Sequence, residues 1–452
     1  MKTVLPGSAA LIVVSASLAA ADGHLMVAPG EGAFDWASYE AFAEAHDYSG
    51  EALTIFGPWL AGEGEAFQDL VNFFNEATGA DGTYTGSDSL EQQIVIDAEA
   101  GSAPNLAVFP QPGLAANMAA RGFLTPLAEG TEDWIVENFA AGESWVDLGT
   151  YADDAGTDQL YGFFFNVNVK SLVWYIPENF EDFGYEVPET MEEFTALMDL
   201  MVEDGETPLC VGLGSGGATG WPATDWVEDL MLRTHPPEVY DAWVSNDMPF
   251  DDPKVIEVLD LYGSLTGNDD YVAGNAADTA AVDFRDSPKG LFESPPQCMM
   301  HRQASFIPAY FPEGTELGLD ADFFYFPAFE DKDLGTPVLG AGTLFAITNP
   351  SEAAAGFIEF LKTPFAHEIM MARDGFLTPY LAANADLYSN DTQRGQGEIL
   401  TNATTFRFDG SDLMPGGVGA GTFWTGMVDY SSGSKDAATV AAEIQSSWDA
   451  LK

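Results

Sequence analysis

Five pairs of nearby residues place aromatic rings, carboxylates, amides and an arginine close together in the sequence. Sugar rings stack their C–H faces on aromatic side chains, while their hydroxyls need planar hydrogen-bonding partners such as carboxylates, amides and guanidinium groups. The pairs are Trp59 with Glu63, Phe109 with Gln111, Trp221 with Asp225, Arg302 with Gln303, and Phe423 with Trp424. Core packing explains any single pair equally well. Their recurrence just after predicted strands favours a carbohydrate-binding site.

Other kinds of active site are poorly supported. The glycine-rich run at residues 212–217 lacks the Gly-Lys-Ser/Thr ending of a phosphate-binding loop, so we interpret it as a tight strand-to-helix connection. Ser215 does not stand in the Gly-x-Ser-x-Gly context of a hydrolase nucleophile. With 72 Asp and Glu residues, carboxylate pairs at glycosidase separation must arise by chance, so their number does not indicate hydrolysis.

The composition indicates a folded, strongly acidic protein with more than one lobe. The 452 residues are about three times the ~150-residue prior for a single domain. A chain with 46% hydrophobic and only 19% charged residues is not expected to be disordered. The formal net charge of −57 repels phosphate backbones and anionic lipid headgroups, which argues against nucleic acid and membrane surfaces as partners.

The acidity has two interpretations. Solubility in a saline medium is favoured, because salt screens self-repulsion beyond about 10 Å. Calcium binding is the alternative, with oxygen ligands from two runs: Asp153, Asp154 and Asp158, or Asn268, Asp269 and Asp270. Neither run has the EF-hand pattern, and the sequence has no Cys-x-x-Cys or His-x-x-x-His spacing, so no metal site is predicted.

The first 21 residues have the pattern of a secretory signal peptide. Lys2 precedes an uncharged stretch over residues 3–21 that ends in three alanines before Asp22. Pro6, Gly7 and many small residues make this stretch too weakly apolar for a transmembrane anchor. No cysteine follows it for lipid attachment. We expect cleavage after Ala21 and a free protein in the periplasm of a Gram-negative cell, with no membrane anchor.

Cys210 and Cys298 are the two cysteines of the chain. In an oxidising compartment two cysteines are more often paired than free, so we predict a disulfide between them. The alternative is that both are small buried hydrophobic residues, since residues 209–211 resemble a buried strand.

The N-terminal part of the mature chain alternates strand-like and helix-like segments. Strands are predicted at 53–56, 83–85 and 106–109, and helices at 65–78, 89–100 and 114–120. This βαβαβα order implies a mainly parallel sheet covered by helices on both faces, with ligands bound beyond the carboxyl ends of the strands.

The remainder of the chain suggests a second lobe that shares strands with the first. Residues 161–169 form a long extended run that continues through 173–175, so one strand could cross between the lobes here. Further strands are predicted at 209–213 and 337–347, and helices at 192–202, 226–233 and 352–361. The sequence contains no tandem repeat and no low-complexity linker.

Several motifs follow one another in a colinear order that is typical of one protein family. They are LTIFGPWLAGEGEAFQDLVNFFNEATG, SDSLEQQI, PNLAVFPQPG, YGFFFNVNVKSLVWY, VPETMEEF, GWPATDWVEDLML, CMMHRQASFIPAYF, PVLGAGTLFAI, GFLTPY and GTFWTGMVDY. Over nearly all of the mature chain the sequence resembles the extracytoplasmic sugar-binding proteins of ABC importers. Its GWPATDW, CMMHRQASF and GTFWTGMVDY blocks are most similar to the alpha-glucoside-binding branch.

This resemblance implies ligand contacts from both lobes and from the hinge. On the first lobe the matching positions are Trp59, Leu60, Asp88, Phe109 and Gln111, and Asn168 falls at the hinge. The second-lobe or hinge positions are Trp221, Arg302, Gln303, Gly342 and Trp424. The chain has Trp59 and Leu60 where maltodextrin-binding relatives have a polar, charged pair, which counts against long maltodextrins.

We therefore predict an α/β bilobal protein with the periplasmic-binding-protein fold, in which hinge strands join two parallel-sheet lobes. Residues 22–166 and 343–384 would form the N-terminal lobe, and residues 169–340 and 385–452 the C-terminal lobe. The predicted function is capture of a small neutral alpha-glucoside such as sucrose, maltose or trehalose, and its delivery to the transmembrane permease subunits of an ABC importer. We expect no enzymatic activity, no cofactor and a monomer.

Two other functions remain open. A secreted glycan-active hydrolase would also have a groove of aromatics and carboxylates, but no feature selects the required carboxylate pair. A polyamine-binding importer component would need a negative pocket, and Arg302 counts against it.

Overall fold

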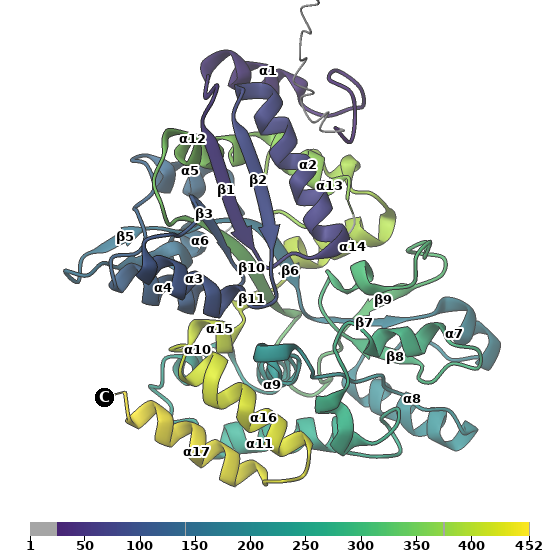
Figure 1. The fold of residues 1–452 in the computed structure, drawn as a ribbon. Coiled ribbons are helices and arrows are strands. Elements are labelled where there is room, and N and C mark those ends of the chain that lie inside the picture. The colour runs from purple at the N-terminus through teal and green to yellow at the C-terminus, as the bar shows by residue number, and fades with distance from the viewer. Residues whose placement is uncertain (1–24, 141, 374–375, 452) are drawn as a thin grey trace, which may run out of the picture.

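Two hydrophobic cores divide the structure, a computed structural model that describes residues 25–140, 142–373 and 376–451 (Figure 1). One core takes its buried side chains from between Tyr39 and Val167 and from between Ala341 and Phe408. The main core of the other half lies between Val173 and Leu339 and between Met414 and Trp448. The bilobal α/β class is confirmed, whereas the exact lobe boundaries stay a prediction. The predicted signal peptide at 1–21 lies outside the described residues.

The large sheet of the first lobe is built on three parallel strands. Strand β1 (Ala52–Gly57) pairs with β2 (Asp81–Gly86) on one side and with β3 (Leu106–Phe109) on the other. Each strand is followed by a helix: α2 (Ala61–Thr78), α3 (Leu90–Ala100) and α4 (Pro112–Ala120). The βαβαβα prediction is thus confirmed, with helix starts displaced by up to four residues.

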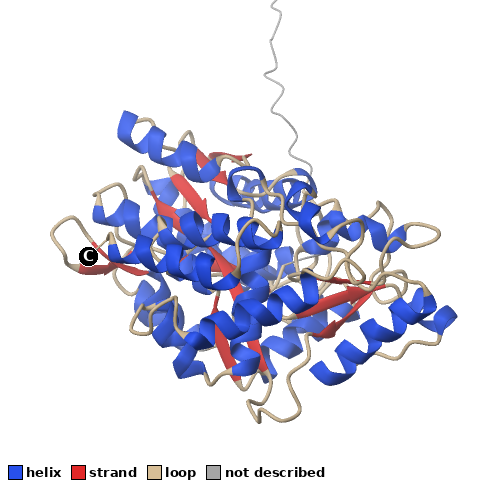
Figure 2. Ribbon diagram, turned by 90° about the horizontal axis from the view of Figure 1, so that it is seen from below, coloured by secondary structure: helices blue, strands red, loops and turns tan. Residues whose placement is uncertain are grey.

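Two long strands continue this sheet toward the second lobe. Strand β10 (Pro337–Ile347) pairs antiparallel with β3 and with β6 (Phe163–Val169), and parallel with β11 (Thr405–Phe408). Every residue of β6 and β10 is buried, because the sheet is covered on both faces. Helices surround the sheet in the view of Figure 2.

The rest of the first lobe consists of short strands and helices around this sheet. A small antiparallel pair is formed by β4 (Thr150–Ala152) and β5 (Asp158–Leu160). The remaining helices here are α1 (Trp36–Ala45), α5 (Thr131–Asn138), α6 (Gly142–Gly149), α12 (Glu352–Leu361) and α13 (Pro364–Met371). After a 3-10 turn at Ala385–Leu387, helix α14 (Asp391–Asn402) contacts both β6 and, in the second lobe, the strand at Asp322–Tyr325.

The second lobe is mostly helical, and here the sequence prediction needs correction. Its sheet has three strands, β7 (Leu172–Tyr175) between β8 (Met300–Arg302) and β9 (Asp322–Tyr325), and both pairings are antiparallel. A parallel second sheet was expected. The predicted strand at 209–213 forms only isolated bridges, such as Leu209 with Val272 and with Met300. Gly212 packs closely on Ser287 and Gly214 on Val282, and Gly214 forms a further isolated bridge with Asp283.

Helices build the remaining core of the second lobe. They are α7 (Pro177–Phe183), α8 (Met191–Asp204), α9 (Trp221–Thr234), α10 (Pro237–Val244), α11 (Pro253–Thr266), α15 (Gly410–Leu413), α16 (Trp424–Ser431) and α17 (Ala437–Asp449). Short 3-10 segments lie at Gly216–Ala218, Ala276–Ala281, Ser287–Phe292 and Ile307–Tyr310, and a π-helical segment at Val418–Phe423. No helix among the described residues is long and apolar enough to cross a membrane.

Helix α9 is the central element of this lobe, and Figure 1 shows it nearly end-on below the large sheet. All of its residues after Trp221 are buried, including Asp225, Glu228, Asp229 and Arg233. Buried charges need partners, since an isolated charge in a protein interior is strongly unfavourable. The partners of these four residues determine much of the candidate site described below.

The predicted disulfide between Cys210 and Cys298 is present. The two Cα atoms are 5.4 Å apart and the bond joins segments separated by 88 residues. Next to it, the Cys210 backbone N–H donates to the Met300 carbonyl oxygen at 2.8 Å.

Candidate ligand-binding site

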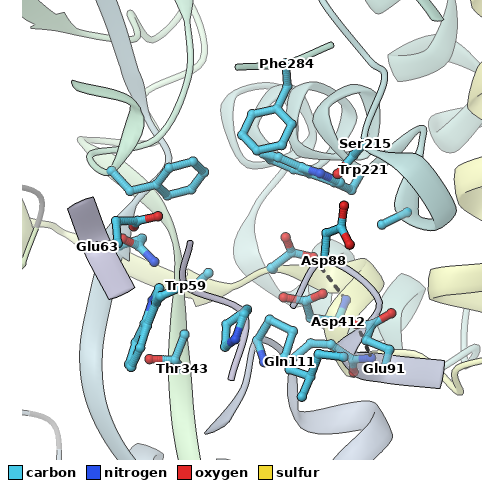
Figure 3. Close-up of a pocket in the computed structure, with 18 of the residues that line it drawn as sticks. Trp59, Glu63, Asp88, Glu91, Gln111, Ser215, Trp221, Phe284, Thr343 and Asp412 are labelled. Carbon is cyan, nitrogen blue, oxygen red and sulfur yellow. Dashed lines mark hydrogen bonds between the residues drawn. The ribbon is translucent and has the colours of Figure 1, made fainter. Parts of the chain in front are cut away.

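A cavity of about 230 Å³ lies where the two lobes meet (Figure 3). The hinge strands β6 and β10 contribute Asn166, Asn168, Ala341 and Thr343 to its wall. The first lobe contributes residues within 58–63, 87–92 and 110–111, and the second lobe contributes residues within 215–221, 284–285, 306–310 and 409–424. A ligand in this cavity would touch both lobes.

On the first-lobe side, three strands end at the cavity and three helices begin there. Trp59 follows β1, and Glu63 lies in the first turn of α2. Asp88 lies between β2 and α3. Gln111 follows β3 as the N-cap of α4, where its side-chain oxygen accepts a hydrogen bond from the Leu114 backbone N–H at 2.9 Å. These side chains converge because the carboxyl ends of parallel strands meet at one edge of a sheet.

The loop that carries Trp59 is held tightly. The Trp59 backbone N–H donates to the Tyr84 hydroxyl at 2.8 Å, and that hydroxyl donates to the Trp59 carbonyl oxygen at 3.1 Å. A side chain at Gly86 would place its Cβ 1.9 Å from the same carbonyl oxygen. The close approach of this loop to β2 therefore requires glycine at position 86.

An aromatic surface lies on the second-lobe side. The Trp221 ring, at the start of α9, packs edge-on against Phe284 with centroids 5.0 Å apart, and lies 6.1 Å from the Phe306 ring. The Lys170 ammonium is 5.3 Å from the centre of the Trp221 ring. Figure 3 shows Trp221 and Phe284 on the side of the cavity opposite Gln111 and Thr343.

Besides Arg285 Nε, three buried polar atoms of lining residues have no hydrogen-bond partner among the described residues. They are Asn168 Oδ1, Thr343 Oγ1 and Trp424 Nε1. Each parent residue is less than a tenth exposed. Buried polar groups in folded proteins are nearly always paired, with protein, water or ligand. The carbonyl of Asn168 can accept, the indole of Trp424 can donate, and the Thr343 hydroxyl can do either.

Lys170 lies at the centre of a buried charge network beside the cavity. Its ammonium donates to Asp225 Oδ1 at 2.8 Å and also to Asp409. Glu228 accepts from the Ser411 backbone N–H at 2.8 Å. The side-chain oxygens of Asp225, Glu228 and Asp409 lie within 4.8 Å of one another. Such a group could hold a metal ion in isolation, but here the ammonium already supplies the cation.

The pKa shifts in this network follow from burial and from the charges and hydrogen bonds around it. Burial would raise the pKa of Asp409, but the Lys170 charge and the hydrogen bonds from Lys170, Glu228 and the Asp412 backbone N–H together lower it to about 2. Burial would lower the pKa of Lys170, yet the nearby carboxylates, with Asp225 first, raise it. Burial, and then the charges of Asp409 and Asp225, raise the pKa of Glu228 well above its usual value. These shifts favour the protonated form of Glu228.

A second charged group lies at another part of the cavity wall. The Tyr310 hydroxyl donates to Glu63 Oε2 at 3.0 Å, and this hydrogen bond runs between the lobes. Burial raises the pKa of Glu63 to about 7, although the Tyr310 hydrogen bond and the Arg285 charge oppose the shift. Near neutral pH this carboxyl therefore exists in both protonation states.

The cavity brings together seven of the residues predicted from the sequence. They are Trp59, Glu63, Asp88, Gln111, Asn168, Trp221 and Trp424. They come from six separated segments of the chain, so the proximity predicted from strand order is present in the structure. Their role as ligand contacts stays a prediction.

Three predicted residues with apolar or no side chains lie outside the lining. Phe109 is fully buried in the first core. Phe423 packs against Trp243 and Phe250 in the second. Gly342, in β10, has its Cβ position 3.0 Å from the Phe164 ring, so its role is close strand packing. Each lies next to the cavity in sequence but faces the core.

Three predicted polar residues are also buried away from the lining. Asp225 binds Lys170. Arg302 binds Asp229 Oδ2 at 2.6 Å, and thereby completes the second charge network of α9. The Gln303 side-chain oxygen accepts from the Ala304 backbone N–H at 2.8 Å. Sequence proximity to aromatic residues did not distinguish these buried pairs from ligand-facing groups.

The sequence analysis missed several lining residues, chiefly Lys170, Arg285, Tyr310, Thr343 and Asp412. Lys170 had a usable signal. It is one of only 15 basic residues and follows an apolar hinge strand directly, which indicates a buried ion pair. The other four stand in a turn, a strand, a 3-10 segment and a short helix, without a distinctive local pattern.

The two acidic runs considered for calcium make local turns. Asp153 Oδ1 accepts from the backbone N–H groups of Ala155 and Thr157, both at 2.8 Å. Asn268 Oδ1 accepts from the Asp270 backbone N–H at 3.0 Å. Backbone capping explains both runs without an ion.

A bilobal α/β fold with an aromatic and polar cavity between the lobes defines the class of two-lobed binding proteins. The chain belongs to the family of bacterial extracellular solute-binding proteins, whose family model matches residues 57–364. Its members are binding proteins, as are the named relatives, and the prediction of a non-enzymatic protein is confirmed.

Two relatives match almost the whole chain. The alpha-glucosides-binding periplasmic protein AglE of Rhizobium meliloti is 60% identical, over 94% of this chain and 93% of its own. The osmoprotective compounds-binding protein GgtB of Synechocystis is 40% identical, over 89% and 93% of the two chains. Among solved structures, the solute receptor AcbH has a TM-score of 0.76 at 20% identity, covering 89% of this chain and 99% of that one. This last similarity concerns the fold alone.

Proposed function

We propose that this protein captures a small, neutral alpha-glucoside in the cavity between its lobes. The observation that carries the proposal is the set of unpartnered buried atoms Asn168 Oδ1, Thr343 Oγ1 and Trp424 Nε1, in a cavity that the indole ring of Trp221 also lines. A sugar ring supplies hydroxyls that both donate and accept, and a C–H face for the indole. A ligand with donors alone could not satisfy Trp424 Nε1.

A similar protein supports a neutral ligand more directly than the charge of the lining does. Two basic residues line the cavity, Lys170 and Arg285, together with five acidic ones: Glu63, Asp88, Glu91, Asp409 and Asp412. Asp409 is paired with Lys170, and Glu63 accepts a hydrogen bond from Tyr310. A polyamine would bring further positive charge close to Lys170 and Arg285. The 60% identical relative is named for alpha-glucosides, which supports this ligand class.

We further propose that the protein works as the monomeric periplasmic component of an ABC importer. The signal-peptide pattern at 1–21 would direct export, with cleavage after Ala21. The closed, loaded form would then be recognised by transmembrane permease subunits. Residues 22–166 with 343–384, and residues 169–340 with 385–452, would be the lobes that move.

The direct test is calorimetric titration of the mature protein with maltose, sucrose and trehalose, with spermidine as the cationic comparison. At a hundredfold excess over the dissociation constant, a bound sugar should stabilise the fold by about 2.7 kcal/mol in thermal unfolding. Chromatography after prolonged incubation should recover the sugar intact.

Two matched variants locate the site. Trp221→Ala should weaken sugar binding by about 1–3 kcal/mol, as expected for a buried aromatic contact. Trp243→Phe, in the core of the second lobe, removes an indole at a distance from the cavity and should leave affinity unchanged. Binding of spermidine but of none of the sugars would refute the proposal, and so would steady release of glucose from a bound glycoside.

A further inference from the structure

The lobes touch directly at one edge of the cavity through Tyr310 and Glu63. Tyr310 ends the segment Ile307–Tyr310 of the second lobe, whereas Glu63 belongs to the first turn of α2 in the first lobe. The hydroxyl-to-carboxylate distance is 3.0 Å. Both residues line the cavity. A ligand that continued outward between these two side chains would have to break this contact.

Tyr310 is held in this position by its neighbours. Its ring lies 5.7 Å from the Phe284 ring in an edge-on arrangement. The Arg285 guanidinium lies 4.4 Å from the centre of the Phe284 ring and 5.7 Å from that of Tyr310. Arg285 is in turn 3.3 Å from Asp283. The tyrosine is thus one part of a packed group and not an isolated side chain.

The lobes also approach each other elsewhere around the cavity. A Cβ at Gly217 would lie 3.2 Å from the Gln92 amide nitrogen, so α3 and the segment Gly216–Ala218 are nearly in contact. In Figure 3, Glu63 lies at one side of the drawn residues, and Glu91 and Asp412 lie at the other. The volume of about 230 Å³ is below the ~300–1,000 Å³ of pockets for drug-sized ligands.

We propose that the Tyr310–Glu63 contact closes one end of the cavity and restricts the ligand to the size of a mono- or disaccharide. The inference rests on the proposed function and adds to it the residues that set ligand length. A third sugar unit on that side would have to displace the Tyr310 ring from Phe284 and leave the Glu63 carboxyl without its partner. Unpaired buried groups discriminate strongly between ligands.

The test compares affinity within matched pairs of sugars, maltose with maltotriose and sucrose with raffinose, by calorimetric titration. The parent protein should bind at least one disaccharide tenfold or more tightly than its trisaccharide partner. Tyr310→Ala should reduce the ratio of disaccharide affinity to trisaccharide affinity at least tenfold, chiefly by improved trisaccharide binding. Tyr310→Phe keeps the ring but loses the hydrogen bond, and should reduce the ratio less, by about threefold.

Tyr271→Ala is the matched control. Tyr271 also donates its hydroxyl to a carboxylate, that of Asp199 at 2.5 Å, in the second lobe but away from the cavity. This variant should keep the parent protein's ratio of disaccharide affinity to trisaccharide affinity. If Tyr310→Ala fails to fold, Tyr310→Phe alone decides the test.

The outcomes separate this inference from the proposed function. A parent that binds di- and trisaccharides equally well overturns the length restriction and leaves alpha-glucoside binding intact. A parent that prefers disaccharides, with the preference unchanged in Tyr310→Ala and Tyr310→Phe, overturns the role of Tyr310. A parent that binds none of the four sugars overturns the proposed function, and this inference with it.

Discussion

The Lys170 ammonium is the residue-scale feature on which the interior of the site depends. It is the cation that faces Asp225, Asp409 and, at longer range, Asp412 and Glu228. Removing one partner of a buried ionic group leaves uncompensated charge, which costs far more than the pair contributes when intact.

Lys170→Met should therefore lower the free energy of unfolding by about 3–5 kcal/mol at neutral pH. The loss should shrink in mildly acidic buffer, because protonation removes the carboxylate charges that the ammonium balanced. Lys435→Met is the control. Lys435 also binds two carboxylates, Asp429 and Glu443, but on the surface, so its loss should be barely measurable. Urea unfolding followed by tryptophan fluorescence measures the free energy of unfolding of both variants. Equal losses in Lys170→Met and Lys435→Met would contradict this prediction.

Glu63 should make ligand affinity depend on pH near neutrality. Its pKa is raised to about 7, so the carboxyl gains its charge as pH rises through that value. Burial is the largest cause of this shift and outweighs the Tyr310 hydrogen bond and the Arg285 charge, so closure of the lobes over Glu63 favours its protonated form. Tyr84, the other titratable group that faces Glu63, stays neutral in this range.

Between pH 6 and 8 sugar affinity should therefore fall, by up to about tenfold if Glu63 has its ordinary pKa in the open form. Glu63→Gln should abolish the fall, whereas Asp88→Asn, which changes an exposed lining carboxylate, should preserve it. Calorimetric titration across this range measures the effect. A fall that persists in Glu63→Gln would assign it to another group.

At the residue scale, the sequence predicted which types of residue form the site but not which way their side chains point. Trp59, Trp221 and Trp424 were placed correctly at the cavity because each stands at or next to the start of a helix. Arg302 and Asp225 have equally polar side chains, yet they turn inward to pair with Asp229 and Lys170. The direction depends on the packing of α9 against β10 and on its ion pairs with Lys170 and Arg302, which local sequence does not encode.

At the scale of elements, the strand-and-helix alternation of the first lobe was readable because each segment has a simple pattern. Strand β3 is a continuous apolar run, buried at all four positions, and α2 has its apolar residues at helical spacing. The segment at 209–213 has the same apolar character as β3 but forms no ladder. Its pairing depends on loops near 272 and 283 that are remote in sequence.

Gly86 links two of these elements and gives a sharp prediction. Its Cβ position lies 1.9 Å from the Trp59 carbonyl oxygen, so Gly86→Ala must push the Trp59 loop away from β2. We expect a loss of about 1–3 kcal/mol in stability, typical of overpacking, and weaker sugar binding because Trp59 moves. Thermal unfolding and titration measure these two effects.

Gly62→Ala is the control for this substitution. Gly62 lies in the first turn of α2 with nothing within 4 Å of its Cβ position. Alanine is the better helix former, so this variant should be as stable as the parent or slightly more so. An unchanged Gly86→Ala protein would show that the Trp59 loop moves freely, contrary to the contacts described.

At the scale of the whole molecule, β6 and β10 carry the chain between lobes, so the lobes cannot be cut apart in sequence. Residues near 166 and 343 pair within one sheet although they are far apart along the chain. The extended run at 161–169 indicated such a crossing. The antiparallel second sheet could not be foreseen, because its three strands come from residues 172, 300 and 322 and beyond.

The net charge of −57 is a property of the whole molecule and leads to the last prediction. The screening length falls from about 10 Å at 0.1 M salt to about 3 Å at 1 M, so repulsion among surface carboxylates should weaken over this range. The melting temperature should rise by several degrees between these concentrations of sodium chloride.

Calcium chloride at equal ionic strength should have the same effect if screening is the cause. A larger rise with calcium at millimolar concentration would instead indicate a specific site. In that case Asp153→Asn and Asp269→Asn should remove the extra stabilisation selectively, depending on which acidic run binds the ion. If the melting temperature is insensitive to both salts, self-repulsion contributes little to stability, and the acidity then acts on solubility alone.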